Sequence, residues 1–371
     1  MNDFHFTVID PNQIKAAELV LPCSDLNEAL DFYTKDLGFR VDAIFPADAP
    51  RIAVISGYGV RIRLEHDTEA APNRMRLLLN DIEPGSNKSD PLYAPDGTRI
   101  EFAPVDSPLE LPPLAPTFVL QQATEDSWGT GRAGMKYRDL IPDRLGGRYI
   151  ASHIRIPNGG PVPDYVHHHH VRFQMIYCYN GWVKVVYEDQ GPPFIMNAGD
   201  CVLQPPHIRH RVLECSDDMQ VIEISCPAEH ETLVDHDMEL PTTSVHLDRK
   251  FSGQRFVYHQ VNKAKWRPGP FSGFEARDTG IGKATDGLAS AQIIRPSGDP
   301  QATTIRHNGE FFFNFVLQGT ATLQRQRQAQ QALAAGDSFV IPAGMQITLT
   351  ECSKDLELLQ VASNLGQGTN N

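Results

Sequence analysis

The sequence predicts a mainly β protein in which two jelly-roll or barrel units follow a small α+β domain. Three observations carry this prediction. Residues 15–105 read as a series of strands with one helix after the first strand. An internal repeat spans roughly 135–228 and 274–362. Each copy consists of short strands separated by Gly, Pro and Asn turns, which is typical of jelly rolls and barrels.

The first section predicts a β-α-β-β-β order. Residues 17–22 form a short apolar strand, and Asp25-Leu-Asn-Glu28 reads as a capping box that starts a helix. Apolar residues then recur at helical spacing until Gly38, which supplies the stop. Strand-like runs follow at 40–44, 51–56, 60–65 and 75–79, and a turn plus strand at 93–102 closes the section.

This order resembles the vicinal oxygen chelate superfamily, which includes glyoxalases and bleomycin-resistance proteins. The resemblance rests on Asp-Leu…Phe-Tyr…Leu-Gly-Phe after the first strand and on Pro-Asp-Gly-Thr-Arg-Ile-Glu-Phe at the end. It implies that Glu18 occupies the place of a His ligand and Glu101 the place of the last Glu ligand. Family members usually need two such modules to enclose a metal. The alternative is that both side chains are ordinary strand carboxylates, because the other ligands have no evident source.

The internal repeat is supported by four matched segments. The pairs are Arg138-Asp139 with Arg277-Asp278, Ala198-Gly-Asp200 with Ala335-Gly-Asp337, Leu203-Gln-Pro-Pro206 with Val340-Ile-Pro-Ala343, and Glu214-Cys-Ser-Asp217 with Glu351-Cys-Ser-Lys354. Both copies therefore predict the same set of strands.

The two copies resemble cupins, whose pattern consists of two short blocks. In the first block a His-x-His pair precedes a Glu and then a Gly, and in the second a Gly and a Pro precede another His. In the first copy, Gly181 closes block one, which puts Gln174 in the Glu place. Gly199 opens block two, Pro205 follows, and His210 lands on the second-block His. The resemblance implies a bicupin, with a metal site in the first copy.

The run of four histidines before Gln174 permits two pairs, His167 with His169 or His168 with His170. Neighbouring residues on a strand point to opposite faces, so one pair excludes the other. In the second copy, His307 lies five residues before Phe312, which occupies the Glu place. Its ungapped equivalent in the first copy is His169, so the repeat favours His167 and His169.

The second copy lacks most of the ligand pattern. Ile305, Phe312 and Ile347 stand at three of its four ligand positions, and His307 is the survivor. It should bind no metal at this place. We expect it to have a structural role or to hold an apolar ligand.

Three imidazoles in the first copy predict a metal site with open coordination positions. Neutral imidazole suits Fe, Zn, Ni and Cu, and open positions are typical of catalytic sites. Gln174 in place of Glu removes a negative charge, which favours an anionic chelating substrate. We expect Fe(II) above all, with Zn, Mn or Ni as the other candidates. Arg172 and Tyr177 flank the site as candidate catalytic residues together with Gln174; the alternatives are an arginine on the outer sheet face and a packed tyrosine.

These observations divide the chain into five segments. They are 1–105, the chelate-like domain; 106–134, a Pro-rich linker and arm; 135–235, the metal-binding cupin; 236–273, a linker; and 274–371, the degenerate cupin.

Three functions are compatible with the sequence. The first is an Fe(II) dioxygenase that acts with O2 on a small enolisable, phenolic or thiol substrate. The second is a metal-dependent isomerase, lyase or decarboxylase of a sugar acid or keto acid. The third is a non-catalytic small-molecule binding protein. A net charge of −13 argues against nucleic acid or an anionic membrane as partner.

The remaining features predict a cytoplasmic protein. The first residues lack the pattern of a signal peptide, and no apolar run approaches the length of a membrane span. The six cysteines are scattered, as expected for free thiols in a reducing compartment. Cupins and chelate-fold modules commonly pair, so a homodimer is a further expectation.

Overall fold

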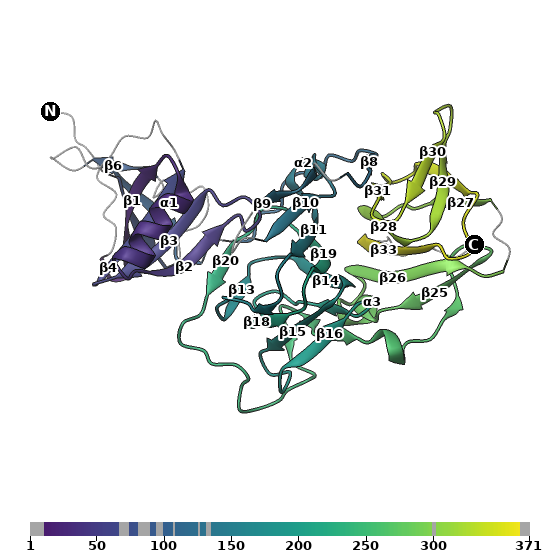
Figure 1. Cartoon of the computed structure of the whole chain (residues 1–371). Helices are drawn as coiled ribbons and strands as arrows, with labels where there is room; N and C mark the ends of the chain where they lie inside the picture. Colours follow the sequence, from purple (N-terminus) through teal and green to yellow (C-terminus); the bar gives the residue numbers. More distant parts are fainter. Residues whose placement is uncertain are drawn as a thin grey trace. The chain divides into compact units, whose positions relative to one another are not determined.

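The structure is a computed structural model that describes residues 11–66, 74–80, 90–93, 99–106, 108–124, 127–130, 135–298 and 302–363. The chain forms two compact units, one of residues 1–110 with 231–234 and one of residues 111–230 with 235–371. Both units are mainly β (Figure 1). Among the described residues, no helix is long and apolar enough to cross a membrane.

The first unit is one sheet with a helix on one face (Figure 1). Its sheet order is β20-β2-β3-β4-β1-β5-β7-β6, with β1 parallel to β4 and β5 parallel to β7. Its elements are η1 (Pro11–Gln13), β1 (Ile14–Cys23), α1 (Leu26–Asp31), η2 (Phe32–Asp36), β2 (Arg40–Phe45), β3 (Ile52–Gly57), β4 (Val60–His66), β5 (Arg74–Leu79), β6 (Leu92–Tyr93), β7 (Arg99–Pro104) and β20 (Thr232–Val234).

The predicted helix start in this unit is confirmed. The Asp25 carboxylate accepts hydrogen bonds from the backbone N–H groups of Asn27 and Glu28, which have no partner inside the helix. Leu26 of α1 then packs against Ile55 and Leu64 of the sheet. This apolar contact holds the helix against one face. The turn predicted at 94–98 lies outside the described residues.

The second unit contains both copies of the repeat, here called module 1 and module 2. Module 1 contains β9 (Gly129–Thr130), β10 (Lys136–Asp139), α2 (Arg144–Gly147), β11 (Ile150–Ile156), β12 (Gly160–Pro161), β13 (His167–His169), β14 (Phe173–Asn180), β15 (Trp182–Tyr187), β16 (Phe194–Asn197), β17 (Cys201–Leu203), β18 (His210–Cys215), β19 (Met219–Cys226), β21 (Lys250–Phe251), β22 (Gln254–Arg255), β23 (Val257–His259) and η6 (Val261–Lys263). Module 2 contains β8 (Val119–Gln121), β24 (Arg267–Pro268), β25 (Phe274–Asp278), α3 (Ile281–Ala284), β26 (Ala289–Pro296), β27 (Thr303–Arg306), β28 (Phe311–Gln318), β29 (Thr320–Arg325), β30 (Gln331–Ala334), β31 (Ser338–Val340), β32 (Gln346–Thr350) and β33 (Glu357–Ser363).

Each module is a cupin-like sandwich of two antiparallel sheets. In module 1 the sheet β23-β17-β14-β19-β11-β10-β9 faces the strands β16-β15-β18-β13. In module 2 the sheet β24-β25-β26-β33-β28-β31-β8 faces β27-β32-β29-β30. The order of equivalent strands is the same, which confirms the repeat. Within the described part of the chain, hydrogen bonds do not close either sandwich into a continuous barrel.

The two modules pack sheet against sheet through the outward faces of β14 and β28. Because side chains alternate along a strand, Phe173 and Met175 face module 2, whereas Gln174 faces into module 1. Phe311 and Phe313 provide the matching face of module 2 and are fully buried. Apolar burial therefore joins the modules into one unit.

The segments expected as linkers contribute strands instead. β8, from the arm, pairs with β31 of module 2, and β23, from the 236–273 linker, pairs with β17 of module 1. Asp200 and Asp337, which the repeat matches, hold these added strands in place. Asp200 accepts hydrogen bonds from the N–H groups of Asn197 and Val261, and Asp337 from those of Ala334 and Ala123.

Candidate metal centre

Three histidines of module 1 converge on one point. His167 on β13 lies directly opposite His210 on β18 in an antiparallel pair, so both side chains lie on the same face. His169 stands two residues further along β13 and therefore shares that face. One ring nitrogen of each residue lies within 4.8 Å of the others. The structure thus brings together the three residues that the sequence indicated.

The other two histidines of the run lie elsewhere. The rings of His168 and His170 lie near the ring of His207, at centroid distances of 5.6 Å and 5.2 Å. Burial, with Arg209 and His207 nearby, lowers the pKa of His168 to about 4. The run is therefore divided between two faces, as strand alternation predicts.

Hydrogen bonds fix the ring nitrogens that are available at the site. His167 Nδ1 donates to the backbone oxygen of Tyr165 at 2.8 Å, and His210 Nδ1 donates to that of Ile208 at 3.0 Å. A neutral imidazole that donates from Nδ1 keeps its lone pair on Nε2. Both rings are therefore in the tautomer that suits a metal ligand.

Asp164 links the two strands that carry these ligands, and the sequence did not single it out. Its carboxylate accepts a hydrogen bond from the N–H of Val212 on β18 at 2.9 Å. The other carboxylate oxygen lies 3.5 Å from His167 Nδ1. Asp164 is 7% exposed, so both contacts lie in a buried environment.

Gln174 takes part in a buried row of hydrogen bonds. Its Oε1 accepts from Gln204 Nε2 at 3.0 Å, and its Nε2 donates to Glu223 Oε1 at 3.2 Å. Tyr187 donates from its hydroxyl to Gln204 Oε1 at 2.5 Å. Both polar ends of Gln174 are thus hydrogen-bonded within this row.

Gln204 connects this row to the histidines, because its Nε2 lies 3.4 Å from His210 Nε2. Sequence reasoning missed Gln204 and Glu223 as members of the site. A signal was present in the repeat, where Gln204 aligns with Ile341. The first copy has a polar residue, Gln204, where the second copy has the apolar Ile341. Such a difference at an inward position indicates a polar site inside the first copy.

His230 also borders the cluster and was not foreseen. Its ring centroid lies 5.4 Å from that of His169, and its Nδ1 donates to the backbone oxygen of Pro227 at 3.1 Å. No motif of the first copy includes this position, which follows β19 and lies outside both sequence blocks.

Two predicted catalytic residues lie away from the cluster, and these placements are corrections. Tyr177 is 4% exposed and belongs to the apolar core between the modules, because it stands on the outward face of β14. Burial raises the pKa of its hydroxyl. Arg172 pairs with Glu310 of module 2 at 3.5 Å. The alternatives of a packed tyrosine and a structural arginine describe these two residues better.

In module 2, the positions equivalent to the clustered histidines are mostly apolar. Ile305 lies directly opposite Ile347, as His167 does opposite His210. Both isoleucines are 1% exposed and offer no ligand atom. His307 uses both ring nitrogens, donating from Nε2 to the oxygen of Ile341 at 2.5 Å and accepting at Nδ1 from the N–H of Gly309 at 3.2 Å. The ring nitrogens of His307 are thus both engaged in hydrogen bonds with the backbone.

The two candidate carboxylates of the first unit, Glu18 and Glu101, are engaged with arginines. Glu18 is 3% exposed and pairs with Arg61 at 2.7 Å and Arg76 at 3.5 Å. Glu101 pairs with Arg99 at 3.3 Å and Arg74 at 3.5 Å. Among the described residues, one group of three or more His, Cys, Asp or Glu side chains lies close enough together to bind a metal ion. It consists of the three histidines of module 1 and contains neither Glu18 nor Glu101. The alternative of ordinary strand carboxylates therefore fits this unit.

Comparison with known proteins gives one family and a set of distant structures. The family model described as Glyoxalase/Bleomycin resistance protein/Dioxygenase superfamily matches residues 15–217, more than half of the chain. The matched span contains strands β2 to β7 of the first unit, nearly all of β1, and all three clustered histidines. A search of curated proteins found no match.

Solved structures with related folds share little sequence with this chain. The protein Ylba from E. coli, assigned to the family model DUF861, has a TM-score of 0.48 at 11% identity, covering 67% of this chain and 91% of its own. A variant of oxalate decarboxylase from Bacillus subtilis has a TM-score of 0.46 at 12% identity, covering 65% and 76%. At these scores the two proteins do not inform the function of this chain.

Proposed function

The chain belongs to the Glyoxalase/Bleomycin resistance protein/Dioxygenase superfamily, and from this premise we propose that it is a metal-dependent enzyme, with Fe(II) held by His167, His169 and His210. We propose further that it is a dioxygenase for a small substrate that chelates the metal through an enolate, phenolate or thiolate. Zn, Mn and Ni are the other metals that this donor set suits.

The observation that carries the proposal is the convergence of three buried imidazoles, two of which have a tautomer defined by hydrogen bonds. The ligand atoms lie within 4.8 Å of one another, and two rings already donate from Nδ1 to backbone oxygens. Three ligands on one side of an ion leave the other side open for substrate. Such an arrangement is typical of catalytic rather than structural metal sites.

The charge of the site supports an anionic substrate. All three candidate ligands are neutral, and Gln174 replaces the carboxylate that the cupin pattern has at this position. Among the described residues, the close group of candidate ligands contains no carboxylate, so it brings no negative charge to the bound ion. When bound, Fe(II) would supply the Lewis acidity and the electron relay that reactions with O2 require.

The protein's own residues have clear tasks in this scheme. Asp164 orients His167 and the strand of His210 through its two carboxylate oxygens. Gln204 donates to Gln174, and its Nε2 lies 3.4 Å from His210 Nε2, so the row from Tyr187 to Glu223 fixes the amide orientations beside the cluster. These groups position ligands, and no step of the chemistry is assigned to them.

The test uses untagged protein, because terminal histidines would bind the same ions. Metal-free protein is loaded anaerobically with Fe(II), mixed with candidate diketones, catechols or thiols, and then exposed to O2 in an oxygen electrode. We expect O2 uptake that depends on substrate and that His169→Ala and His210→Ala abolish. Turnover without O2 would instead support an isomerase, lyase or decarboxylase. A protein that binds small molecules but remains silent with every metal would contradict the proposal of an enzyme.

A further inference from the structure

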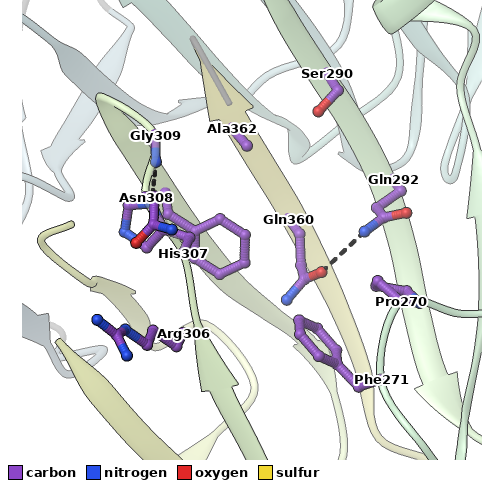
Figure 2. Close-up of a pocket in the computed structure, with 11 residues that line it drawn as sticks. Pro270, Phe271, Ser290, Gln292, Arg306, His307, Asn308, Gly309, Gln360 and Ala362 are labelled. Atoms are coloured by element: carbon purple, nitrogen blue, oxygen red, sulfur yellow. Dashed lines mark hydrogen bonds between the residues drawn. The ribbon is translucent and has the colours of Figure 1, made fainter. Parts of the chain in front are cut away.

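Module 2 contains a cavity of about 390 Å³ at the place equivalent to the one where module 1 gathers its histidines. Its walls come from β26, β27, β28 and β33 and from the segment before β25 (Figure 2). The volume suits a ligand with one ring, since small-molecule sites begin at roughly 300 Å³. Nothing in the proposed chemistry of module 1 uses this cavity.

One part of the wall is aromatic and rigid. Phe312 occupies the position equivalent to Gln174, and His307 stacks on it at a centroid distance of 4.9 Å and an interplanar angle of 21°. Burial lowers the pKa of His307, and both of its nitrogens are hydrogen-bonded, so the ring is a neutral, fixed plane. Phe271 adds a further ring to the lining. These surfaces favour a flat, apolar body.

Another part of the wall is a row of amides. Gln292 Nε2 donates to Gln360 Oε1 at 3.1 Å, and Gln360 Nε2 donates to Asn314 Oδ1 at 2.8 Å (Figure 2 shows the first bond). Gln360 is 2% exposed, so the row belongs to the interior. An amide keeps a second N–H after making one such bond. The row can therefore present donors to an oxygen atom of a ligand.

The charge of the lining is positive. Arg306 lies at the cavity, and no aspartate or glutamate is among the lining residues. Arg306 is exposed on β27, and no carboxylate in the described part of the chain forms an ion pair with its guanidinium. Guanidinium groups bind carboxylates with two parallel hydrogen bonds.

We propose that module 2 binds a small planar organic carboxylate in this cavity. Its ring lies against Phe271 and Phe312, and its carboxylate pairs with Arg306. Module 2 has Ile305 and Ile347 where module 1 has His167 and His210. On this proposal, the equivalent place in module 2 binds an organic anion instead of a metal ion. This site is independent of the proposed function of module 1.

The test measures benzoate binding by isothermal titration calorimetry on the untagged full chain in the presence of a chelator, which removes metal-bound benzoate from consideration. Benzamide, a neutral compound of the same shape, is titrated in parallel. We expect wild-type protein to bind benzoate at least ~10-fold more tightly than benzamide. Arg306→Gln should remove this preference and leave benzamide unchanged, and Phe271→Ala should weaken both.

Matched variants locate the site. Arg327→Gln removes an exposed arginine of the same module outside the cavity and should keep wild-type affinity. The double variant His169→Ala/His210→Ala should also keep it. Arg306→Glu should reverse the preference toward the cation benzamidine, which shows a correctly folded cavity with inverted charge. The proposal is overturned by the absence of benzoate binding at millimolar concentration, or by affinities that are equal in Arg306→Gln and Arg327→Gln.

Discussion

Single residues in the run 167–170 acquire different roles because consecutive strand residues point to opposite faces. His167 and His169 face His210, whereas His168 and His170 face His207. Chemically identical side chains are thus separated by backbone geometry alone. Backbone oxygens then select the tautomer of His167 and His210.

This division gives a direct prediction for metal content. His169→Ala and His210→Ala each remove one of three ligands, so metal affinity should fall by more than the ~10–100-fold typical of losing a group that only orients a ligand. His168→Ala and His170→Ala are the matched controls and should retain nearly all of the metal. Elemental analysis of dialysed, untagged protein measures this. Loss of metal in the controls but not in the first pair would show that the other face binds the ion.

A second residue-level prediction concerns Gln174→Glu. In the wild type, Gln174 donates to Glu223 at 3.2 Å, so the variant places two carboxylates in contact. At alkaline pH the like charges of the ionised pair repel each other, and the unfolding free energy of metal-free protein should fall by about 1–3 kcal/mol. One shared proton restores the donor, so the deficit should shrink as the pH is lowered toward 5. Urea denaturation at both pH values measures it, and a deficit independent of pH would contradict the assigned contact.

At the scale of secondary-structure elements, each module depends on a strand from outside its repeat. Asp200 holds the segment after β23 through the N–H of Val261 and also accepts from the Tyr258 hydroxyl at 3.3 Å. Asp337 holds the segment after β8 through the N–H of Ala123 at 2.7 Å. The Ala-Gly-Asp motif in both copies therefore has a structural meaning, because its carboxylate fastens an added edge strand.

These clamps predict local opening in the corresponding variants. Asp200→Ala leaves the N–H groups of Asn197 and Val261 without their acceptor, and Asp337→Ala does the same at β8. Each should lower the local opening free energy by about 1–3 kcal/mol. Hydrogen exchange should speed up at 257–259 in the first variant and at 119–121 in the second. Each variant serves as the control for the other, and identical patterns in both would contradict separate clamps.

At the scale of the whole second unit, His153 stands where the modules meet. It accepts from Arg138 at Nδ1 and donates from Nε2 to Gln220, and its ring contacts Phe315 of module 2. Burial, reinforced by the Arg138 charge, lowers its pKa from the ordinary 6.5 to about 4. The folded protein thus holds this histidine neutral in a range where the unfolded chain protonates it.

The sign of the pH dependence follows. Between pH 6.5 and 4 the unfolded state binds more protons at this residue, so its contribution to stability falls as the pH is lowered. The contribution lost at pH 5 is about 2 kcal/mol. His153→Gln can keep both hydrogen bonds without titrating, so it should lose less unfolding free energy between pH 7 and 5 than the wild type does. Urea unfolding at matched pH values checks this, and equal losses would assign the acid sensitivity to other groups.

Local pattern predicted the strand repeat and the convergence at the metal centre, because both depend on spacing within and between neighbouring strands. The place of Tyr177 could not be predicted, since it depends on module 2 covering the outward face of β14. The ion pair of Arg172 with Glu310 spans 138 positions and has no motif. The strands in the 106–134 arm and the 236–273 linker could not be predicted, because strands of two or three residues show too little periodicity.

The position of β8 in the chain bears on how the coding sequence can be divided. β8 is made before any other part of module 2, and all of module 1 is translated between it and its partner β31. No single break in the coding sequence after β8 yields two complete modules, because the fragment with module 1 keeps residues 119–121. A shortened expression clone of module 2 alone should therefore need this segment restored, as a fused leader or an added peptide.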